Sequence, residues 1–400
     1  MSKRPIAYGG QTIDGEDTRS VLEVLDSPCL TQGPYVEAFE EALARYTGAR
    51  YAVACSSGTA ALHLACLTAG ITDGKRAVTV PNTFVATPNS ILHAGGTPVF
   101  VDIDAASGAV DLEKLEEVMS YDVRAVIPVH YGGEPLPMEK LRVCAGSGDV
   151  FIIEDACHGL GARWRDSSGR WRMVGSCYGS DMTVFSFHPV KSITTGEGGA
   201  VTTNERGLYM RLKELRSHGI TKTPSRGRHW PPWHYEMRSL GFNYRISDIQ
   251  CALGLAQLKK IGSFMKRRRE IAALYGRLFS GCGDLLKTPF EPQGCESAWH
   301  LYPIRIDFKG LGINKQRWFA LMLEKGIALQ VHYIPVHLQP YYKRRFGYHR
   351  GDFPEAERFF AMEASLPIFP SLSDKTVKYI AESVISTLSR AQSQKRKKAV

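Results

Sequence analysis

Between residues 36 and 260, short apolar runs of strand type alternate with amphipathic runs of helical type. Strands that are separated by helices usually pair in parallel, so this alternation predicts βαβ units and a mostly parallel sheet. We therefore expect an α/β fold with seven strands in this region. They are predicted at Tyr51–Ala54, Ala77–Val80, Pro98–Val101, Ala125–Val129, Phe151–Ile153, Thr183–Phe187 and Gly199–Thr202.

The sequence on either side of this region has a different pattern, so we expect four parts. They are an N-terminal arm and helix at residues 1–35, a large α/β domain at 36–260, a small α+β domain at 261–390, and a basic disordered tail at 391–400. In the small domain, strands are predicted at Leu301–Ile306 and Ala328–His332. Helices are predicted at Asp248–Lys260, Phe264–Leu278, Lys315–Lys325, Phe353–Ala361 and Asp374–Leu388.

The formal net charge of +10 lies partly in two basic runs, Lys266–Arg269 and Lys395–Lys398. Neither run is interleaved with aromatic residues, so we interpret them as a solvated helix face and a frayed terminus, and expect no nucleic-acid partner. No apolar stretch reaches the roughly 18 residues of a membrane span, and no signal peptide is indicated, so we expect a cytoplasmic protein. The nine cysteines form no Cys-x-x-Cys pair, which predicts reduced thiols and no metal site.

One lysine lies in a polar loop between two apolar strands. Lys191 follows the strand Thr183–Phe187, in which Ser186 shares one side with the next alternate residue, His188. A lysine flanked by apolar strands and few acids is desolvated, which disfavours its charged form and makes the amine a nucleophile able to form a Schiff base. The alternative is an ordinary loop lysine at the surface.

Two other strand ends carry groups that suit a single cofactor. If this cofactor is pyridoxal phosphate (PLP), its pyridine nitrogen needs a carboxylate, and Asp155 ends an apolar strand where parallel sheets place ligand groups. After the first strand, a turn of small residues leads into a helix. The backbone N–H groups of Gly58, Thr59 and Ala60 are then free to hold a phosphate, although the same pattern also fits a simple helix cap.

These stretches, in this order, resemble those of the DegT/DnrJ/EryC1/StrS sugar aminotransferases, which are fold-type I PLP enzymes. The resemblance covers nearly the whole chain and implies a large domain with a mostly parallel seven-stranded sheet plus a small C-terminal domain. The loop that carries Lys191 looks most like the pseudaminic acid branch of the family. Further marks are Leu30–Pro34, Ser57–Thr59, Pro81–Thr87, Pro98–Asp102, Glu154–Ala156, Arg216–Gly219, Gly241–Arg245 and Val331–Tyr333.

The resemblance implies a role for each cofactor-binding residue. Lys191 would carry PLP and shuttle a proton, while Asp155 would pair with the ring nitrogen. Phe84 would stack on the ring, with a core aromatic as the alternative, and His158 would reach the ring face or its phenolic oxygen, with a structural histidine as the alternative. Ser186 would donate to the phosphate, together with Gly58, Thr59, Ala60 and, from a neighbouring subunit, Asn243.

The resemblance also implies the substrates and the assembly. They are a UDP-linked 4-keto-sugar as amino acceptor and L-glutamate as amino donor, used by a homodimer with shared active sites. His188, His337 and Tyr341-Tyr342 remain undecided. The implied substrate-binding residues are Tyr8, Pro28, Cys29, Leu30, Thr31, Gly58, Ser186, Asn243, Gln330, Val331, His332 and Tyr333, for several of which simple packing is the alternative.

Several alternative functions remain open. The chain could aminate another nucleotide-linked keto-sugar, of the bacillosamine, perosamine or antibiotic type. A sugar dehydrase is disfavoured because the dehydrases of this family carry histidine where Lys191 stands. A PLP-fold regulator that binds DNA is disfavoured by the presence of Asp155, Ser186 and Lys191 together. An irregular loop at 221–240 is predicted to act as a lid or an interface.

Overall fold

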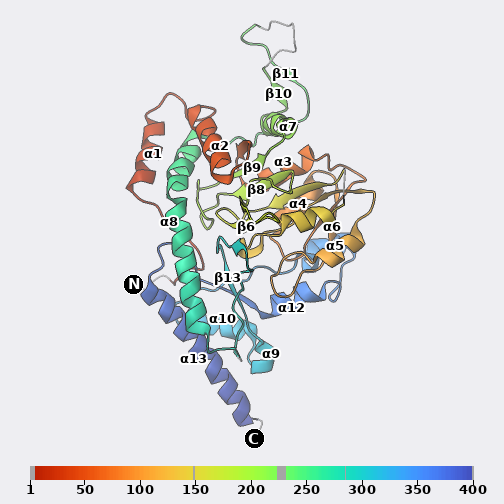
Figure 1. Cartoon of the computed structure of the whole chain (residues 1–400). Helices are drawn as coiled ribbons and strands as arrows, with labels where there is room; N and C mark the ends of the chain where they lie inside the picture. The colour runs from red at the N-terminus through yellow and green to blue at the C-terminus, as the bar shows by residue number, and fades with distance from the viewer. Residues whose placement is uncertain (1–4, 147–148, 223–230, 284, 399–400) are drawn as a thin grey trace.

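The computed structural model describes residues 5–146, 149–222, 231–283 and 285–398. Its central sheet has seven strands in the order β1-β9-β8-β5-β4-β2-β3 (Figure 1). Four neighbouring pairs, from β8 to β3, are parallel, whereas β9 is antiparallel to both of its neighbours. The predicted seven-stranded, mostly parallel sheet is confirmed. The strands are β1 (Tyr51–Cys55), β2 (Arg76–Thr79), β3 (Thr97–Phe100), β4 (Val123–Val126), β5 (Phe151–Asp155), β8 (Met182–Ser186) and β9 (Gly199–Thr203).

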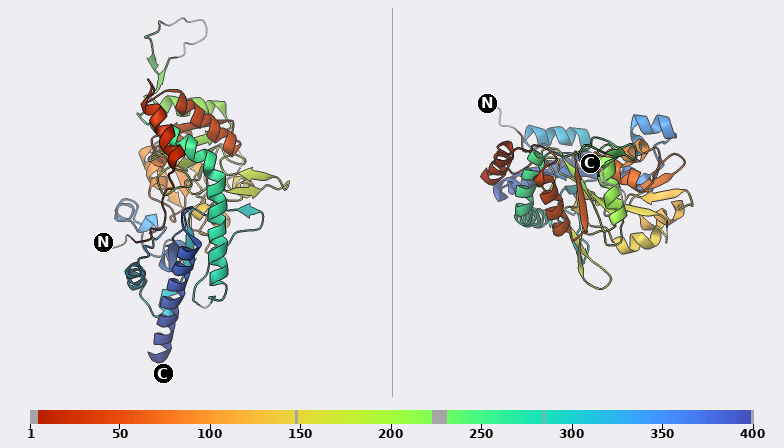
Figure 2. Two further views of the ribbon diagram at one scale, coloured as in Figure 1. Left: turned by 90° about the vertical axis from the view of Figure 1, so that its left-hand side faces the viewer. Right: turned by 90° about the horizontal axis from the view of Figure 1, so that it is seen from above.

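Helices cover both faces of this sheet (Figure 2). Successive residues of one strand point into different cores. Val184 packs with residues of α3 and α7, while Phe185 packs with residues of α2 and α8 (Asp248–Phe279). This two-sided burial explains why the strands are continuous apolar runs. The helices that flank the strands are α2 (Pro34–Thr47), α3 (Gly58–Thr68), α4 (Ala86–His93), α5 (Leu112–Val118), α6 (Met138–Cys144) and α7 (Arg206–Arg216).

Helix α8 (Asp248–Phe279) runs from the sheet to the C-terminal part of the chain as one helix of 32 residues (Figure 1). The prediction of two helices, separated after Lys260, is therefore wrong. An isolated Gly262 costs the helix only about 1 kcal/mol. The buried side chains of Ile261 and Phe264 hold the helix against the body on both sides of that glycine.

The basic run on α8 is also less exposed than the sequence predicted. Arg268 is fully buried, and its Nη1 donates to the backbone oxygens of Trp299 and Ile368 at 3.0 and 2.9 Å. Burial lowers the pKa of Arg268 to about 10. Arg268 therefore ties α8 to two C-terminal segments rather than lying on a solvated face.

The C-terminal part has its own core around the antiparallel pair β13 (Tyr302–Arg305) and β14 (Glu363–Leu366). Strand β13 was predicted, but the prediction of a strand at Ala328–His332 is wrong. That segment makes a single bridge, from Gln330 to Ser365, and β14 was not predicted. The helices here are α9 (Phe308–Leu311), α10 (Lys315–Glu324), α11 (Pro340–Phe346), α12 (Pro354–Met362) and α13 (Asp374–Lys398).

Helix α13 extends into the tail that was predicted to be disordered. The helix continues to Lys398, so this prediction is wrong for residues 391–398, while residues 399–400 lie outside the described part. Ala391 is buried, and Lys395 Nζ donates to the Gly310 oxygen at 2.5 Å. These contacts, together with residues of good helix propensity, keep the final turns helical.

Smaller elements project from the body. Strands β6 (Arg163–Arg165) and β7 (Trp171–Met173) form a hairpin to which β12 (Cys295–Glu296) adds. Strands β10 (Ile220–Thr221) and β11 (Glu236–Met237) form a two-stranded ladder that projects beyond α7 (Figures 1 and 2). Within the predicted 221–240 loop, Arg226, Arg228, His229 and Trp230 lie outside the described residues.

Candidate active site

A cavity of about 570 Å³ opens where the ends of β5 and β8 meet the start of α3 and the segment 330–334. This is the edge of the sheet at which parallel α/β folds bind ligands. Both predicted catalytic residues line it, as does most of the predicted cofactor and substrate set. The predicted residues in its wall are Tyr8, Gly58, Thr59, Phe84, Asp155, His158, Ser186, Lys191, Gln330, Val331, His332 and Tyr333.

Asp155 is the last residue of β5 and is held by hydrogen bonds to both carboxylate oxygens. Its Oδ2 accepts from Thr87 Oγ1 at 2.6 Å, and its Oδ1 accepts from the Cys157 N–H at 3.1 Å. The Thr87 hydroxyl in turn lies 2.8 Å from Thr83 Oγ1. The carboxylate is therefore fixed in orientation as well as buried, as a partner for a ring nitrogen requires.

Lys191 lies in a tight turn after β8, in which its N–H donates to the His188 oxygen at 2.9 Å. Burial lowers the pKa of the Lys191 amine, and nearby Cys157 and Asp155 offset this only in part. A larger share of neutral amine makes Lys191 a better nucleophile and proton acceptor near neutral pH. The lowered pKa agrees with the prediction that this lysine is desolvated.

The start of α3 lies against Ser186 at the end of β8. A Cβ atom on Gly58 would come within 2.8 Å of the Ser186 Cβ, so only glycine allows this approach. The first N–H groups of a helix have no acceptor within the helix, and here Gly58 and Thr59 supply them to the cavity. Two N–H groups and a hydroxyl thus meet in a cradle that fits a phosphate.

Ala60 does not take part in this cradle, which corrects the prediction. Its N–H donates to the side chain of the N-cap residue Ser57 at 3.1 Å, so it is already satisfied. Ala60 is also absent from the cavity wall. The helix-cap alternative therefore applies to Ala60, while Gly58 and Thr59 stay available for a ligand.

Histidines form the floor of the cavity. His158 Nε2 lies 3.0 Å from the Tyr333 hydroxyl, and the His158 and His300 ring centroids are 4.3 Å apart. Burial holds the pKa of both imidazoles well below the usual range, and the nearby Lys191 amine contributes to this. Within the described residues, the Nδ1 atoms of both rings are buried without a partner. Both imidazoles are therefore neutral, and both residues line the cavity while their Nδ1 atoms are enclosed by protein.

Phe84 and Tyr8 form the rim. Phe84 is 56% exposed and lies 6.0 Å from the Tyr333 ring, so it is a cavity aromatic and not a core residue. The N-terminal segment is joined to the C-terminal part by a bridge from Ile6 to Ile327. This connection brings the Tyr8 ring to 5.2 Å from the His332 ring.

Five other predicted site residues do not line this cavity within a single chain: Pro28, Cys29, Leu30, Thr31 and Asn243. They lie around the start of α8, where Leu30 accepts from the Asp248 N–H and Thr31 bridges to Ser247. Asn243 bridges to Ser217. For Asn243, a position outside the cavity of its own chain is what the predicted role in a neighbouring subunit requires, and that role stays a prediction.

Several cavity residues were not predicted from the sequence. Thr87 falls within a quoted motif, but nothing in its spacing indicated a bond to Asp155. His300 belongs to a segment without a motif and reaches the cavity through tertiary packing alone. The additional residues in the wall include Ser57, Thr83, Thr87, Cys157, Glu197, His300, Ile334 and Gln339, together with His188, which the sequence left undecided.

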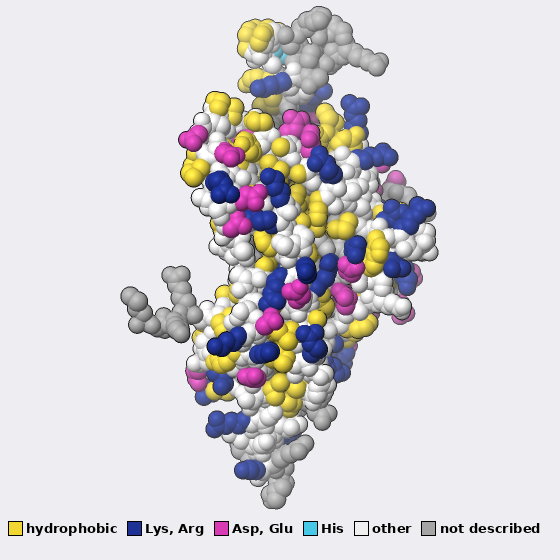
Figure 3. Space-filling view, turned by 60° about the vertical axis from the view of Figure 1, so that its left-hand side comes forward, with side chains coloured by type: hydrophobic (Ala, Val, Ile, Leu, Met, Phe, Trp, Pro, Cys, Tyr) yellow, Lys and Arg dark blue, Asp and Glu magenta, His cyan; other side chains and the backbone are white. Residues whose placement is uncertain are grey.

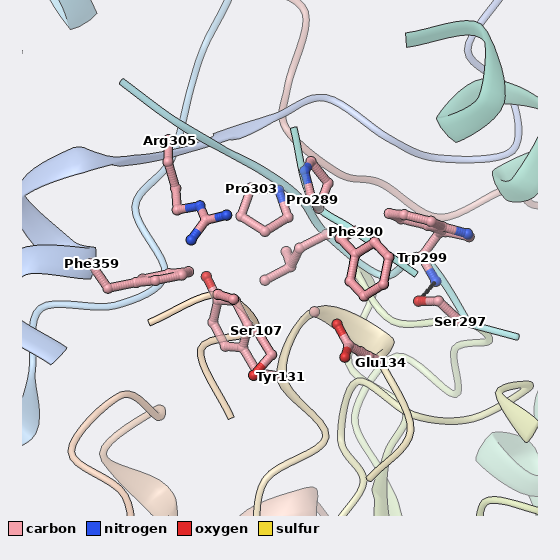
Figure 4. A pocket seen from close by; sticks show the side chains of 13 residues that line it. Ser107, Tyr131, Glu134, Pro289, Phe290, Ser297, Trp299, Pro303, Arg305 and Phe359 are labelled. Atoms are coloured by element: carbon pink, nitrogen blue, oxygen red, sulfur yellow. Dashed lines mark hydrogen bonds between the residues drawn. The ribbon is translucent and has the colours of Figure 1, made fainter. Parts of the chain in front are cut away.

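A second, smaller cavity of about 30 Å³ lies nearby (Figure 4). Glu134, Trp299 and Arg305 are part of its wall, and burial together with nearby carboxylates raises the pKa of Glu134 to about 8. Tyr131 also lines this cavity, and its hydroxyl donates to the His332 oxygen at 2.5 Å. This space is large enough for a water molecule but not for a sugar. The second cavity is therefore not a second substrate site.

The described residues include no cluster of three or more His, Cys, Asp or Glu side chains arranged to hold a metal ion. None of the helices within the described ranges is long and apolar enough to cross a membrane. All nine cysteines are free thiols.

The profile of the DegT/DnrJ/EryC1/StrS aminotransferase family matches residues 11–385. The spore coat polysaccharide biosynthesis protein SpsC of Bacillus subtilis is 39% identical over 381 residues, which are 95% of this chain and 96% of that protein. The UDP-4-amino-4,6-dideoxy-N-acetyl-beta-L-altrosamine transaminase of Campylobacter jejuni serotype O:23/36 is 37% identical over 390 residues, which are 97% and 98% of the two chains.

Solved structures agree with these matches. PseC of Helicobacter pylori, an aminotransferase involved in the biosynthesis of pseudoaminic acid, superimposes with a TM-score of 0.88 at 34% identity and covers 97% of this chain and 100% of its own. The putative sugar aminotransferase Spr1654 of Streptococcus pneumoniae, solved in a PLP form, gives a TM-score of 0.87 at 28% identity over 97% and 99% of the two chains.

Proposed function

Because the chain belongs to the DegT/DnrJ/EryC1/StrS aminotransferase family, it is a PLP-dependent sugar aminotransferase, and we propose its substrates. The amino donor is L-glutamate. The acceptor is a UDP-linked 4-keto-6-deoxy-N-acetylhexosamine, aminated at C4. The product is UDP-4-amino-4,6-dideoxy-N-acetyl-beta-L-altrosamine, the product for which two relatives are named, and it would serve pseudaminic acid biosynthesis.

The observation that carries the proposal is that Lys191 and Asp155 line one cavity with a phosphate cradle. Asp155 would hold the pyridine nitrogen of PLP, and Lys191 would bind its aldehyde carbon. Gly58, Thr59 and Ser186 would hold the phosphate. The donor set fits the group, because the carboxylate is already oriented by Thr87 and two helix N–H groups have no acceptor within α3.

When bound, PLP supplies an electron sink for the carbon that loses a proton. The residues of the chain then have two tasks. Lys191 Nζ accepts a proton at the carbon that carries the amino group and later returns one, for which its lowered pKa is suited. Asp155, whose carboxylate is oriented by two hydrogen bonds, would face the ring nitrogen.

The size of the cavity and the net charge of the whole chain support a nucleotide-sugar substrate. A volume of about 570 Å³ lies in the usual range for small-molecule sites. The excess positive charge of +10 suits a doubly anionic diphosphate. Tyr8 and the segment Gln330–Tyr333 are proposed to contact the sugar nucleotide, with Gly58 and Ser186 shared between cofactor and substrate.

We also propose a homodimer with shared active sites, in which Asn243 and residues 28–31 of one chain complete the cavity of the other. The same end of the molecule exposes hydrophobic side chains (Figure 3). Trp233 is 77% exposed and Leu240 79% exposed on the segment that projects beyond α7, and Leu22 and Leu25 are exposed on α1 (Gly15–Leu25). Large exposed hydrophobic side chains at one end of the molecule support an interface there.

The division into a large domain at 36–260 and a small domain at 261–390 is likewise proposed. The sheet and the β13–β14 pair have separate cores, which supports it. Helix α8 crosses the proposed boundary and connects the two parts.

A second acceptor deserves the same test, because SpsC is at least as similar to this chain as the altrosamine transaminase. SpsC is named as a protein of spore coat polysaccharide biosynthesis. The competing hypothesis is that this chain aminates a different nucleotide-linked keto-sugar on the same cofactor.

The test is an absorbance spectrum of the purified protein with PLP, before and after addition of L-glutamate, beside the Lys191→Ala variant. We expect a visible band that bleaches with glutamate in the wild type only. UDP-linked and other nucleotide-linked 4-keto-sugars are then offered in turn, and the amino-sugar product is identified by mass spectrometry and NMR. A wild-type protein without a glutamate response contradicts the proposed donor, and turnover of only a different sugar contradicts the proposed acceptor.

A further inference from the structure

His332 in the cavity wall is held by a buried polar network that reaches into the C-terminal part of the chain. Its Nδ1 lies 2.8 Å from Ser365 Oγ, and Ser365 Oγ donates to Glu363 Oε1 at 2.6 Å. The other oxygen of Glu363 accepts from the backbone N–H of His332 at 3.0 Å. Both ends of the network are therefore attached to the same histidine.

The remaining polar atom of the His332 backbone is also fixed. The Tyr131 hydroxyl donates to its carbonyl oxygen at 2.5 Å. Glu363 and Ser365 lie on β14 and are fully buried, and His332 is 5% exposed. The imidazole is consequently anchored at its backbone and at one ring nitrogen, by groups that solvent does not reach.

The direction of the hydrogen bonds follows from the number of protons available. A serine hydroxyl has one proton, and Ser365 gives it to the Glu363 carboxylate. The Ser365 oxygen can then only accept from His332, so Nδ1 must carry the N–H. In a neutral imidazole, Nε2 is then an unprotonated acceptor.

The ring is neutral, since burial and then the nearby Lys191 amine lower the pKa of His332 to about 3. Within residues 5–146, 149–222, 231–283 and 285–398, Nε2 has no hydrogen-bond partner, and the residue lines the cavity of about 570 Å³. Nε2 is therefore the ring atom that remains for a ligand.

We infer that Ser365 and Glu363 are positioning residues that hold His332 as its Nδ1–H tautomer, so that Nε2 accepts a hydrogen bond from a hydroxyl or amide N–H of the sugar substrate. This rests on the proposed function for the identity of the ligand, but not for the tautomer. A site built in this way rejects an analogue that lacks the donor, because the acceptor would stay buried and unpaired.

The tautomer is tested by 15N NMR on protein labelled at its 12 histidines, at pH 8, with His332→Gln used to assign the resonance. We expect the Nδ1–H pattern in the wild type. Glu363→Gln should invert it. In this variant the side-chain amide oxygen must accept from the His332 backbone N–H, so the amide NH₂ group donates to Ser365. Ser365 then donates its own proton to His332 Nδ1. An Nε2–H pattern in the wild type, or an unchanged pattern in Glu363→Gln, overturns the positioning role.

Ser365→Ala is the second variant and removes the link without a change of charge. It should leave Nδ1 without its acceptor and shift the ring toward a mixture of tautomers. Glu382→Gln, on the exposed face of α13, is the matched control and should leave the His332 resonances in place. A Ser365→Ala protein that keeps the wild-type pattern also contradicts the network.

The acceptor role is tested by calorimetric binding of UDP-N-acetylglucosamine to the PLP-loaded proteins. We expect about tenfold weaker binding in Glu363→Gln, as for a lost hydrogen bond to a buried group, and no change in Glu382→Gln. The rate of the glutamate-dependent absorbance change should stay within about twofold of the wild-type rate in Glu382→Gln. Unchanged binding of UDP-N-acetylglucosamine in Glu363→Gln overturns the role of His332 Nε2 as a hydrogen-bond acceptor. A wild type that binds no UDP-sugar refutes the proposed substrate, while the NMR result still decides the tautomer.

Discussion

Thr87 Oγ1 donates a 2.6 Å hydrogen bond to Asp155 Oδ2, and both residues are buried at the edge of the sheet that carries the cavity. Thr87 lies in the first turn of α4, whereas Asp155 is the last residue of β5. Since Thr87 gives its proton to Asp155, its oxygen accepts from Thr83 at 2.8 Å. One oxygen of the Asp155 carboxylate is therefore oriented by a chain of two threonines.

Thr87→Val should weaken PLP binding. The change keeps the shape of the side chain but removes the donor, and one oxygen of a buried carboxylate then lacks its partner, at a cost of about 1–3 kcal/mol. We expect about a tenfold rise in the Kd for PLP, measured by absorbance titration of the apo protein. Thr87→Ser should retain most of the affinity, and Thr72→Val, at an exposed threonine, should have no effect. Equal affinity for Thr87→Val and the wild type would contradict this role.

Gly58→Ala should disturb the phosphate cradle. The added Cβ would lie 2.8 Å from the Ser186 Cβ, so α3 must move away from β8. We expect PLP to bind at least tenfold more weakly, because overpacking of this kind costs about 1–3 kcal/mol. The measurement is the same titration, together with thermal unfolding of the apo protein.

Gly262→Ala is the control for the glycine prediction. This position lies inside α8, and an added Cβ meets no atom within 4 Å. The change should leave PLP binding as it is and stabilise the fold by about 0.5–1 kcal/mol, because alanine is the better helix former. Equal loss of cofactor in both variants would show that the effect at Gly58 is not local.

The affinity for the sugar nucleotide should fall as the pH is lowered through about 7. Burial raises the pKa of Glu363 to about 7, although Ser365, Lys315 and the His332 N–H act in the opposite direction. Below that pH the protonated carboxyl donates to Ser365, the hydrogen bonds reverse, and His332 Nε2 gains the proton. The titratable groups that face Glu363 are Lys315, Tyr131, His332 and Tyr333.

Binding of UDP-N-acetylglucosamine should be measured between pH 6 and pH 8.5, in the wild type and in Glu363→Gln. The wild type should lose about tenfold in affinity toward pH 6, which is the converted cost of one hydrogen bond to a buried group. The variant cannot ionise at this position, so its affinity should be low and flat across the range. A parallel slope in the two proteins would contradict the assignment of the pH dependence to Glu363.

Mixed dimers test whether Asn243 serves the neighbouring subunit. Asn243→Ala and Lys191→Ala should each abolish most activity alone, whereas a dimer of one chain of each keeps one intact site, with Lys191 from one chain and Asn243 from the other. We expect about half of the wild-type activity in isolated mixed dimers, obtained with two affinity tags. A mixed dimer without activity would place Asn243 in the site of its own chain.

The strands and the positions of Lys191 and Asp155 at one cavity could be predicted because their signals are local. The apolar runs that bury both faces of the sheet give β5 and β8 directly, and the residues that follow such runs lie at the ligand-binding edge of a parallel sheet. Lys191 and Asp155 were identified on that basis. Two predictions of helices and strands were wrong: the helices expected at Asp248–Lys260 and Phe264–Leu278 form the single helix α8, and Ala328–His332 was expected as a strand, although only Gln330 of that segment forms a bridge.

The sequence by itself therefore determined the sheet, the positions of Lys191 and Asp155 at the cavity, and the family. Only the tertiary structure decided which groups orient them. Thr87 and Asp155 are 68 positions apart, and His332 and Ser365 are 33 apart. A hydrogen bond requires two atoms within about 3 Å with the correct geometry. Hydrophobic periodicity specifies which face of an element is buried, but it does not specify which side chains of distant elements meet.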